Sequence, residues 1–257
     1  MEAKRLNALR GWEWIKQGYA LFMKAPLLWM VLLMICLAAA IGLSTLPVVG
    51  EPLLTLLMPV GMIGLMYGCR MLERGEELEL VHLFSGFQRR MAHLVTLGGI
   101  SLVSQFLIFG LMILAGGAAL VSILMSGEPV TDPAVMVQTI TGAGLAVLIG
   151  IVLFSLLMMA MQYAPMLVYF NNAPPIAAMK LSVSAFMRNI GPMLVYVTTY
   201  MFLAILASLP MFLGWLVLLP LTFTSLYASY RDIFPLVEEK PADTPKVDAF
   251  TPDKDIF

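Results

Sequence analysis

The stretch that decides the fold is PLLWMVLLMICLAAAIGLSTL, residues 26–46, which runs for 21 residues without a charged side chain. A helix needs about 20 apolar residues to cross the hydrocarbon core of a bilayer. The whole chain shares this character, since 60% of its 257 residues are hydrophobic, 12% are charged and the mean hydropathy is +0.91. The stretch is too long for the apolar core of a signal peptide. It therefore predicts a retained membrane span.

Five further apolar stretches predict an all-α integral membrane protein with six transmembrane helices. The predicted spans cover residues 26–46, 53–69, 96–125, 136–169, 191–209 and 213–230. The second and sixth are short and contain proline, so a five-span or re-entrant model stays open. The third and fourth exceed the thickness of a bilayer and must tilt or project beyond it. Residues 1–234 form one membrane domain, and the polar residues 235–257 are expected to be a disordered tail.

The basic residues predict an orientation. All 15 Lys and Arg residues fall in the termini or in the even-numbered connections of the six-span model. The other connections carry only Glu51, Glu128 and Asp132 as charged residues. Positive side chains are enriched on the cytoplasmic side of membrane proteins. The pattern therefore predicts a bacterial inner (plasma) membrane protein with both termini in the cytoplasm, and the net charge of −1 gives no attraction to nucleic acid.

An amphipathic stretch precedes each pair of predicted spans, at residues 8–24, 78–91 and 175–189. The apolar stripe of the first consists of Trp12, Ile15, Tyr19 and Phe22. Helices of this kind lie in the membrane interface. The chain is thus expected to contain three hairpins, each preceded by a cytoplasmic interfacial helix, as a parallel repeat about the membrane normal. Convergence of unrelated hairpins on similar anchors is the alternative.

Two predicted units end alike, because Pro59 precedes Arg70 by eleven residues and Pro220 precedes Arg231 by the same spacing. Gly64 and Gly68 form part of a small-residue face in the second span. Such a face permits close packing within the chain or in a homo-oligomer.

Candidate chemistry is sparse. No Asp, Glu, Lys or Arg lies within the six predicted spans, which argues against a proton relay or a carboxylate-coupled ion site. Phosphate-loop, serine-hydrolase and zinc-protease motifs are absent. Cys36 and Cys69 lack metal-binding spacing, so no metal or cofactor is expected. A Cu(I) pathway through Met58, Met62 and Met66 is a minor alternative to ordinary methionine packing.

Two glutamines and three prolines are the candidates for a pathway or for packing: Gln105, Gln162, Pro59, Pro165 and Pro220. Polar side chains in spans commonly bond between helices, and two facing one cavity would instead line a pathway. Each proline frees a backbone carbonyl one turn earlier. Free carbonyls at membrane depth can build a site or accompany a packing kink, and the kink is the favoured interpretation.

Several short motifs resemble a family of uncharacterised proteobacterial polytopic inner-membrane proteins. They are Trp12-Glu13-Trp14-Ile15, Leu21-Phe22-Met23-Lys24-Ala25-Pro26, Ala164-Pro165-Met166-Leu167-Val168, Ala178-Met179-Lys180-Leu181-Ser182 and Tyr227-Ala228-Ser229-Tyr230-Arg231-Asp232-Ile233-Phe234. More loosely, the chain is similar to the membrane domain fused to some glycerophosphodiester phosphodiesterases. The resemblance implies an inner-membrane location and no particular activity.

Two functions follow as hypotheses. The first is a non-enzymatic membrane protein that organises lipid or partner proteins, with membrane lipids, a protein partner or a second copy of the chain as its contacts. The second is a small transporter or channel for a lipid-like or neutral solute. An intramembrane enzyme is the least favoured, because the chain offers no nucleophile–base pair.

Overall fold

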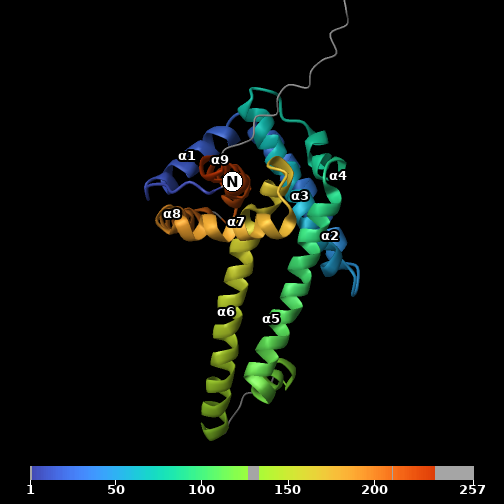
Figure 1. Ribbon diagram of the computed structural model, residues 1–257, viewed down its shortest axis with the longest axis vertical. Coiled ribbons are helices and arrows are strands. Elements are labelled where there is room, and N and C mark those ends of the chain that lie inside the picture. The colour runs from blue at the N-terminus through green and yellow to red at the C-terminus, as the bar shows by residue number, and fades with distance from the viewer. Residues whose placement is uncertain (1, 127–132, 210, 235–257) are drawn as a thin grey trace, which may run out of the picture.

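The computed structural model describes residues 2–126, 133–209 and 211–234, which form helices joined by short connections (Figure 1). The elements in chain order are α1 (Arg10–Phe22), α2 (Pro26–Ser44), α3 (Gly50–Glu73), the 3₁₀ helix η1 (Leu80–Phe84), α4 (Ser85–Gln88), α5 (Met91–Ser126), α6 (Pro133–Phe170), α7 (Pro175–Arg188), α8 (Ile190–Ser208) and α9 (Trp215–Ile233). The described residues contain no strand, so the predicted all-α class is confirmed. The tail predicted for residues 235–257 lies outside the described residues.

Five helices are long and apolar enough to cross a membrane: α2, α3, Met91–Gly116 of α5, Ala143–Phe170 of α6, and α8. They correspond to the first five predicted spans. The sixth, residues 213–230, folds as α9 but is not among the five. Its second half is polar and carries Thr222, Thr224, Ser225, Ser229, Arg231 and Asp232. The six-span model is therefore not confirmed.

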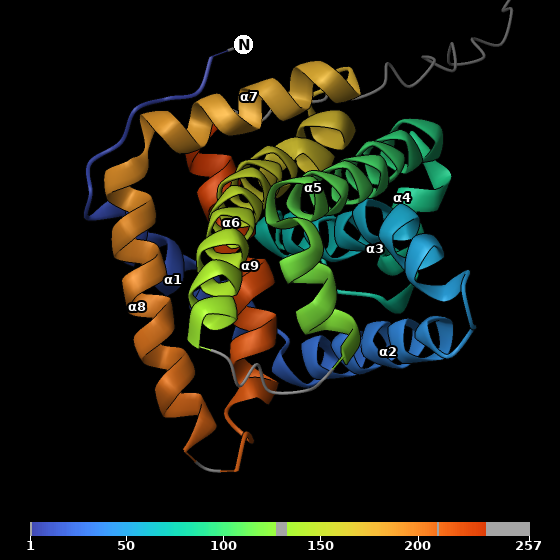
Figure 2. The same ribbon diagram turned by 90° about the horizontal axis from the view of Figure 1, so that it is seen from below.

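The longest helices, α5 and α6, lie side by side and project away from the rest of the molecule (Figure 1). With 36 and 38 residues, they are about 54 and 57 Å long at 1.5 Å per residue. Figure 2 shows the α5–α6 pair nearly end on, and in this view α8 and α9 run from the upper to the lower part of the picture. The α8–α9 pair thus lies across the direction of the α5–α6 pair. The predicted set of three hairpins about one membrane normal is not confirmed by this arrangement.

Helix α1 packs on both α8 and α9, and two glycines bring it close to them. A Cβ atom at Gly11 would lie 2.7 Å from the backbone nitrogen of Tyr196 in α8. A Cβ atom at Gly18 would lie 2.6 Å from the backbone nitrogen of Ser225 in α9. Glycine permits such contacts because it has no side chain.

This packing bears on the predicted role of α1. Ile15 and Phe22 of the predicted stripe are buried, whereas Trp12 and Tyr19 are about half exposed. The fully buried tryptophan of α1 is Trp14, which lies off that stripe. Protein therefore contacts α1 on more than one side, and the placement of α1 in the membrane interface stays a prediction.

The other predicted interfacial helices have different outcomes. Residues 175–189 form α7 as expected, with the small residues Ala178, Ser182 and Ala185 buried. Residues 78–91 do not form one helix and contain only the short elements η1 and α4. This region packs on α3, where Gly64 faces the backbone of Leu83 and Gly68 faces the side chain of Leu78. The small-residue face of α3 thus serves packing within the chain.

Replacing Gly18 by alanine is expected to destabilise the protein, because its Cβ would overlap the backbone of α9. Overpacking of this kind costs about 1–3 kcal/mol. Gly42→Ala in α2 is the matched control, since a Cβ there meets nothing within 4 Å. Thermal unfolding in detergent should show a lower Tm for Gly18→Ala and no loss for Gly42→Ala. Equal Tm values for the two variants would show that the α1–α9 contact is not tight.

Candidate functional site

The end of α9 carries the densest group of charged contacts among the described residues. The carboxylate of Asp232 accepts hydrogen bonds from Arg10 Nε at 2.8 Å, from Arg10 Nη2 at 2.6 Å and from Trp14 Nε1 at 2.9 Å. Both donor residues belong to α1. Three charge-assisted bonds to one carboxylate give a strong and geometrically defined contact.

The electrostatics of this pair favour its ionised form. Burial by itself would raise the pKa of Asp232, but the hydrogen bonds from Arg10 and Trp14 and the nearby positive charges outweigh it, so the pKa is lowered. The hydrogen bond to Asp232 is also the main cause that raises the pKa of Arg10. Each partner therefore stabilises the charge of the other.

The preceding residue, Arg231, makes the second set of contacts. Its guanidinium forms an ion pair with Glu73 of α3 and donates to Gln17 Oε1 of α1 at 2.6 Å. Glu73 also accepts a hydrogen bond from the Tyr227 hydroxyl at 2.8 Å. We call Arg10, Trp14, Gln17, Glu73, Arg231 and Asp232 the Asp232 cluster. It joins α1, α3 and α9 at one end of the molecule.

The N-terminal segment is held beside this cluster by Asn189, which is fully buried between α7 and α8. Its side-chain oxygen accepts from the backbone of Leu6 at 2.9 Å, and its nitrogen donates to the carbonyls of Lys4 at 2.8 Å and Ala185 at 2.9 Å. The backbone nitrogen of Lys4 in turn donates to Ile233 at 3.1 Å. Residues before α1 thus connect the α7–α8 junction to α9.

A serine from α7 enters the backbone ladder of α6 just before Pro165. The Ser182 hydroxyl donates to the carbonyl of Met159 at 2.6 Å and accepts from the backbone nitrogen of Tyr163 at 3.1 Å. Those two backbone groups would otherwise bond to each other in an α-helix. An inserted side chain of this kind accompanies helix bends. The Ser182 hydroxyl thus provides a hydrogen-bond partner to both of these backbone groups of α6.

The structure does not bring the two predicted glutamines together. Gln105 bonds to Ser101 one turn earlier in its own helix, at 3.3 Å. Gly150 lies against Met112, and this register of the α5–α6 hairpin offsets Gln105 from Gln162 by about 7–8 Å along the axis. Pro59, Pro165 and Pro220 are buried within the continuous helices α3, α6 and α9. The pathway hypothesis for these five residues stays a prediction.

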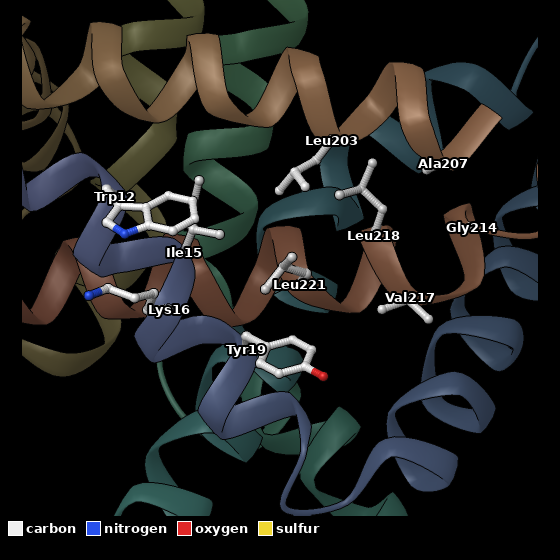
Figure 3. A pocket seen from close by; sticks show the side chains of 10 residues that line it. All are labelled: Trp12, Ile15, Lys16, Tyr19, Leu203, Ala207, Gly214, Val217, Leu218 and Leu221. Carbon is white, nitrogen blue, oxygen red and sulfur yellow. The ribbon is translucent and has the colours of Figure 1, made fainter. Parts of the chain in front are cut away.

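An apolar groove of about 410 Å³ lies between α1, α8 and α9 (Figure 3). Its lining residues are Trp12, Ile15, Lys16, Tyr19, Leu203, Ala207, Gly214, Val217, Leu218 and Leu221. The Lys16 amine points away from the leucines of α8 and α9 (Figure 3) and pairs with Glu13 at 2.7 Å. None of the five predicted site residues lines this groove.

Sequence reasoning missed the main contacts of this region. Asp232 and Trp14 belong to sequence motifs, but no role is predicted from the sequence for either residue or for Asn189. Arg10 and Asp232 are 222 residues apart, so no local spacing connects them. The shared side predicted from the basic residues is the one signal that places Arg10, Arg70 and Arg231 near each other.

The arrangement consists of hydrogen bonds and ion pairs between helices. Glu73 and Asp232 both accept hydrogen bonds from neighbouring side chains. The part of the chain that the structure describes contains no group of three His, Cys, Asp or Glu side chains able to hold a metal ion. The Asp232 cluster therefore acts as a structural contact between helices.

Replacing Asp232 by asparagine should lower stability by about 2 kcal/mol, because Arg10 loses its charged acceptor. The lowered pKa gives the sign of the pH dependence. Stability from this contact is fully present above the ordinary pKa of 3.8 and is lost as the pH falls through the lower pKa of the folded state. Tm differences between the wild type and Asp232→Asn, measured in detergent from pH 7 to pH 3, should therefore shrink below about pH 4. Glu51→Gln, at an exposed position, is the control. A Tm difference between the wild type and Asp232→Asn that stays constant from pH 7 to pH 3 would contradict the assignment.

The chain with this geometry also resembles a known protein. No protein-family model and no solved structure matches it. It is 30% identical over 260 residues to a probable inner membrane protein of Burkholderia thailandensis, and the match covers 93% of this chain and 96% of the relative. The looser similarity to glycerophosphodiester phosphodiesterases gains no support from these matches. The match runs nearly end to end and agrees with five helices able to cross a membrane. The chain therefore belongs to the family of inner-membrane proteins that includes this Burkholderia protein.

Proposed function

We propose that this chain is a non-enzymatic inner-membrane protein that binds phospholipid, with an acyl chain held in the groove between α1, α8 and α9. The observation that carries the proposal is the composition of the groove. Eight of its ten lining residues are Trp, Ile, Leu, Val, Ala or Gly, and the other two are Lys16 and Tyr19. Its volume of about 410 Å³ lies in the range of small-molecule sites.

The lining residues from α1 support a lipid as the occupant. Trp12, Lys16 and Tyr19 bring an indole, an ammonium group and a phenol to the side of the groove formed by α1. Side chains of these types gather where the apolar core of a bilayer meets the head groups. The opposite walls come from Leu203 of α8 and Leu218 of α9. Such a groove suits a molecule with one apolar and one polar part.

The membrane context supports the same occupant. Helix α8 is one of the candidate spans, and many of its apolar side chains are exposed, including Met201, Phe202 and Ile205. Acyl chains are the molecules that contact such a surface in a membrane. A groove lined in part by α8 therefore lies close to the surrounding lipid.

Filling the groove tests the proposal. Leu203→Trp places a large side chain among the lining residues, so the purified protein should retain less phospholipid, measured as moles of lipid per mole of protein by mass spectrometry. Phe202→Trp is the matched control, because it changes the neighbouring residue, which is 61% exposed and does not line the groove. Equal lipid content in the wild type and both variants would overturn the proposal, provided that their Tm values match.

A further inference from the structure

Arg70, three residues before the end of α3, is an unpaired buried cation. Its residue exposure is 8%, and its guanidinium forms no hydrogen bond or ion pair with any other residue that the structure describes. Its described side-chain contact is with the ring of Phe170, whose centroid lies 5.2 Å from Cζ. An aromatic face attracts a cation, but it does not replace oxygen acceptors for five N–H donors.

The nearby polar groups are committed to other partners. Glu73, one turn along α3, pairs with Arg231 and accepts from the Tyr227 hydroxyl. The Tyr230 hydroxyl donates to Asn171 and lies 3.2 Å from the carbonyl of Met166. Both tyrosines lie near Arg70, but their hydroxyls hydrogen-bond to other groups. No carboxylate among the described residues lies within ion-pair distance of this guanidinium.

Arg231 shows which partners an arginine at the corresponding position of the chain can have. Arg231 occupies the position that corresponds to Arg70 in the predicted repeat, eleven residues after a proline. Arg231 has both an acidic partner, Glu73, and an amide acceptor, Gln17. Arg70 has neither. An arginine stays charged at any pH a protein experiences, and a buried charge without a partner is strongly unfavourable.

The site is open enough for an external partner. Among the described residues, the side-chain nitrogen that has neither solvent access nor a hydrogen-bond partner is Trp29 Nε1. The guanidinium nitrogens of Arg70 have no partner either, so they must retain some access to solvent. Arg74, the exposed residue directly after α3, follows Arg70 by one helical turn and lies near Tyr227. The two arginines together present two guanidinium groups at one end of a candidate span.

We infer that Arg70 and Arg74 bind a phosphate group, and that its source is the head group of a membrane phospholipid. Guanidinium groups bind phosphate oxygens through paired N–H donors. Arg70 lies near the end of a helix able to cross the bilayer, where the phosphates of the head groups are located. This site is separate from the groove, since neither arginine lines it.

The experiment compares thermal shifts of the full-length protein in a neutral maltoside detergent. The added probes are dioleoylphosphatidylglycerol, dioleoylglycerol with the same acyl chains but no phosphate, and inorganic phosphate. The wild type should be stabilised more by dioleoylphosphatidylglycerol than by dioleoylglycerol, because only the first offers a phosphate to the arginines, and inorganic phosphate should give no shift. Arg70→Gln should weaken its apparent affinity at least about tenfold, while Arg5→Gln, at an exposed position in the N-terminal segment, should leave it unchanged.

Arg70→Gln has a second expected effect that a purely structural arginine would not show. Without lipid its Tm should equal or exceed that of the wild type, because the change removes an uncompensated buried charge. If Arg70→Gln does not fold, Arg74→Gln at the exposed position should still weaken the response to phosphatidylglycerol.

Three results would overturn the inference. Equal stabilisation by dioleoylglycerol would show that the acyl chains alone account for binding. A response to inorganic phosphate without a response to phosphatidylglycerol would assign the site to free phosphate. An unchanged response in both arginine variants would remove the site. Because the groove is tested by Leu203→Trp, failure there does not affect these outcomes.

Discussion

The two oxygens of Asp232 hold Arg10 and Trp14 against the end of α9, and the position of α1 depends on this contact. Because α1 lies on both α8 and α9, the same carboxylate contributes to the placement of three helices. Arg231 extends the connection to α3 through Glu73. Two adjacent residues at the end of one helix thus join segments from the beginning, the first third and the end of the chain.

The close approach of α1 has consequences for the architecture. Gly11 and Gly18 let the helix backbone contact α8 and α9 directly. With α1 packed on both helices, the α8–α9 pair lies across the long α5–α6 pair (Figure 2). The same packing leaves the apolar groove at the edge of α1, lined by half-exposed aromatic residues on one side and leucines on the other.

The two lipid-binding proposals use opposite parts of one ligand type. The groove offers apolar walls to an acyl chain, whereas Arg70 and Arg74 offer charge to a phosphate. The predicted repeat relates Arg70 to Arg231 of the Asp232 cluster, because each arginine follows a proline by eleven residues. One arginine is satisfied by protein, and the other lacks a protein partner in the described part of the chain.

Apolar length alone was enough to predict the helices. The predicted ranges agree with the bounds of α2, α6 and α8 to within a few residues, because about 20 uncharged apolar residues have few stable alternatives to a helix in lipid. The amphipathic spacing likewise located α1 and α7.

What only the packed structure decided is how the helices meet. The ion pair between residues 10 and 232, the insertion of Ser182 into α6 and the burial of Asn189 join positions far apart in sequence. Periodicity shows which residues share a helix face but does not show which other helix covers that face. For the same reason, hydropathy and amphipathic spacing predicted helices at the positions of α1 and α9 but not that the two pack together around Asp232.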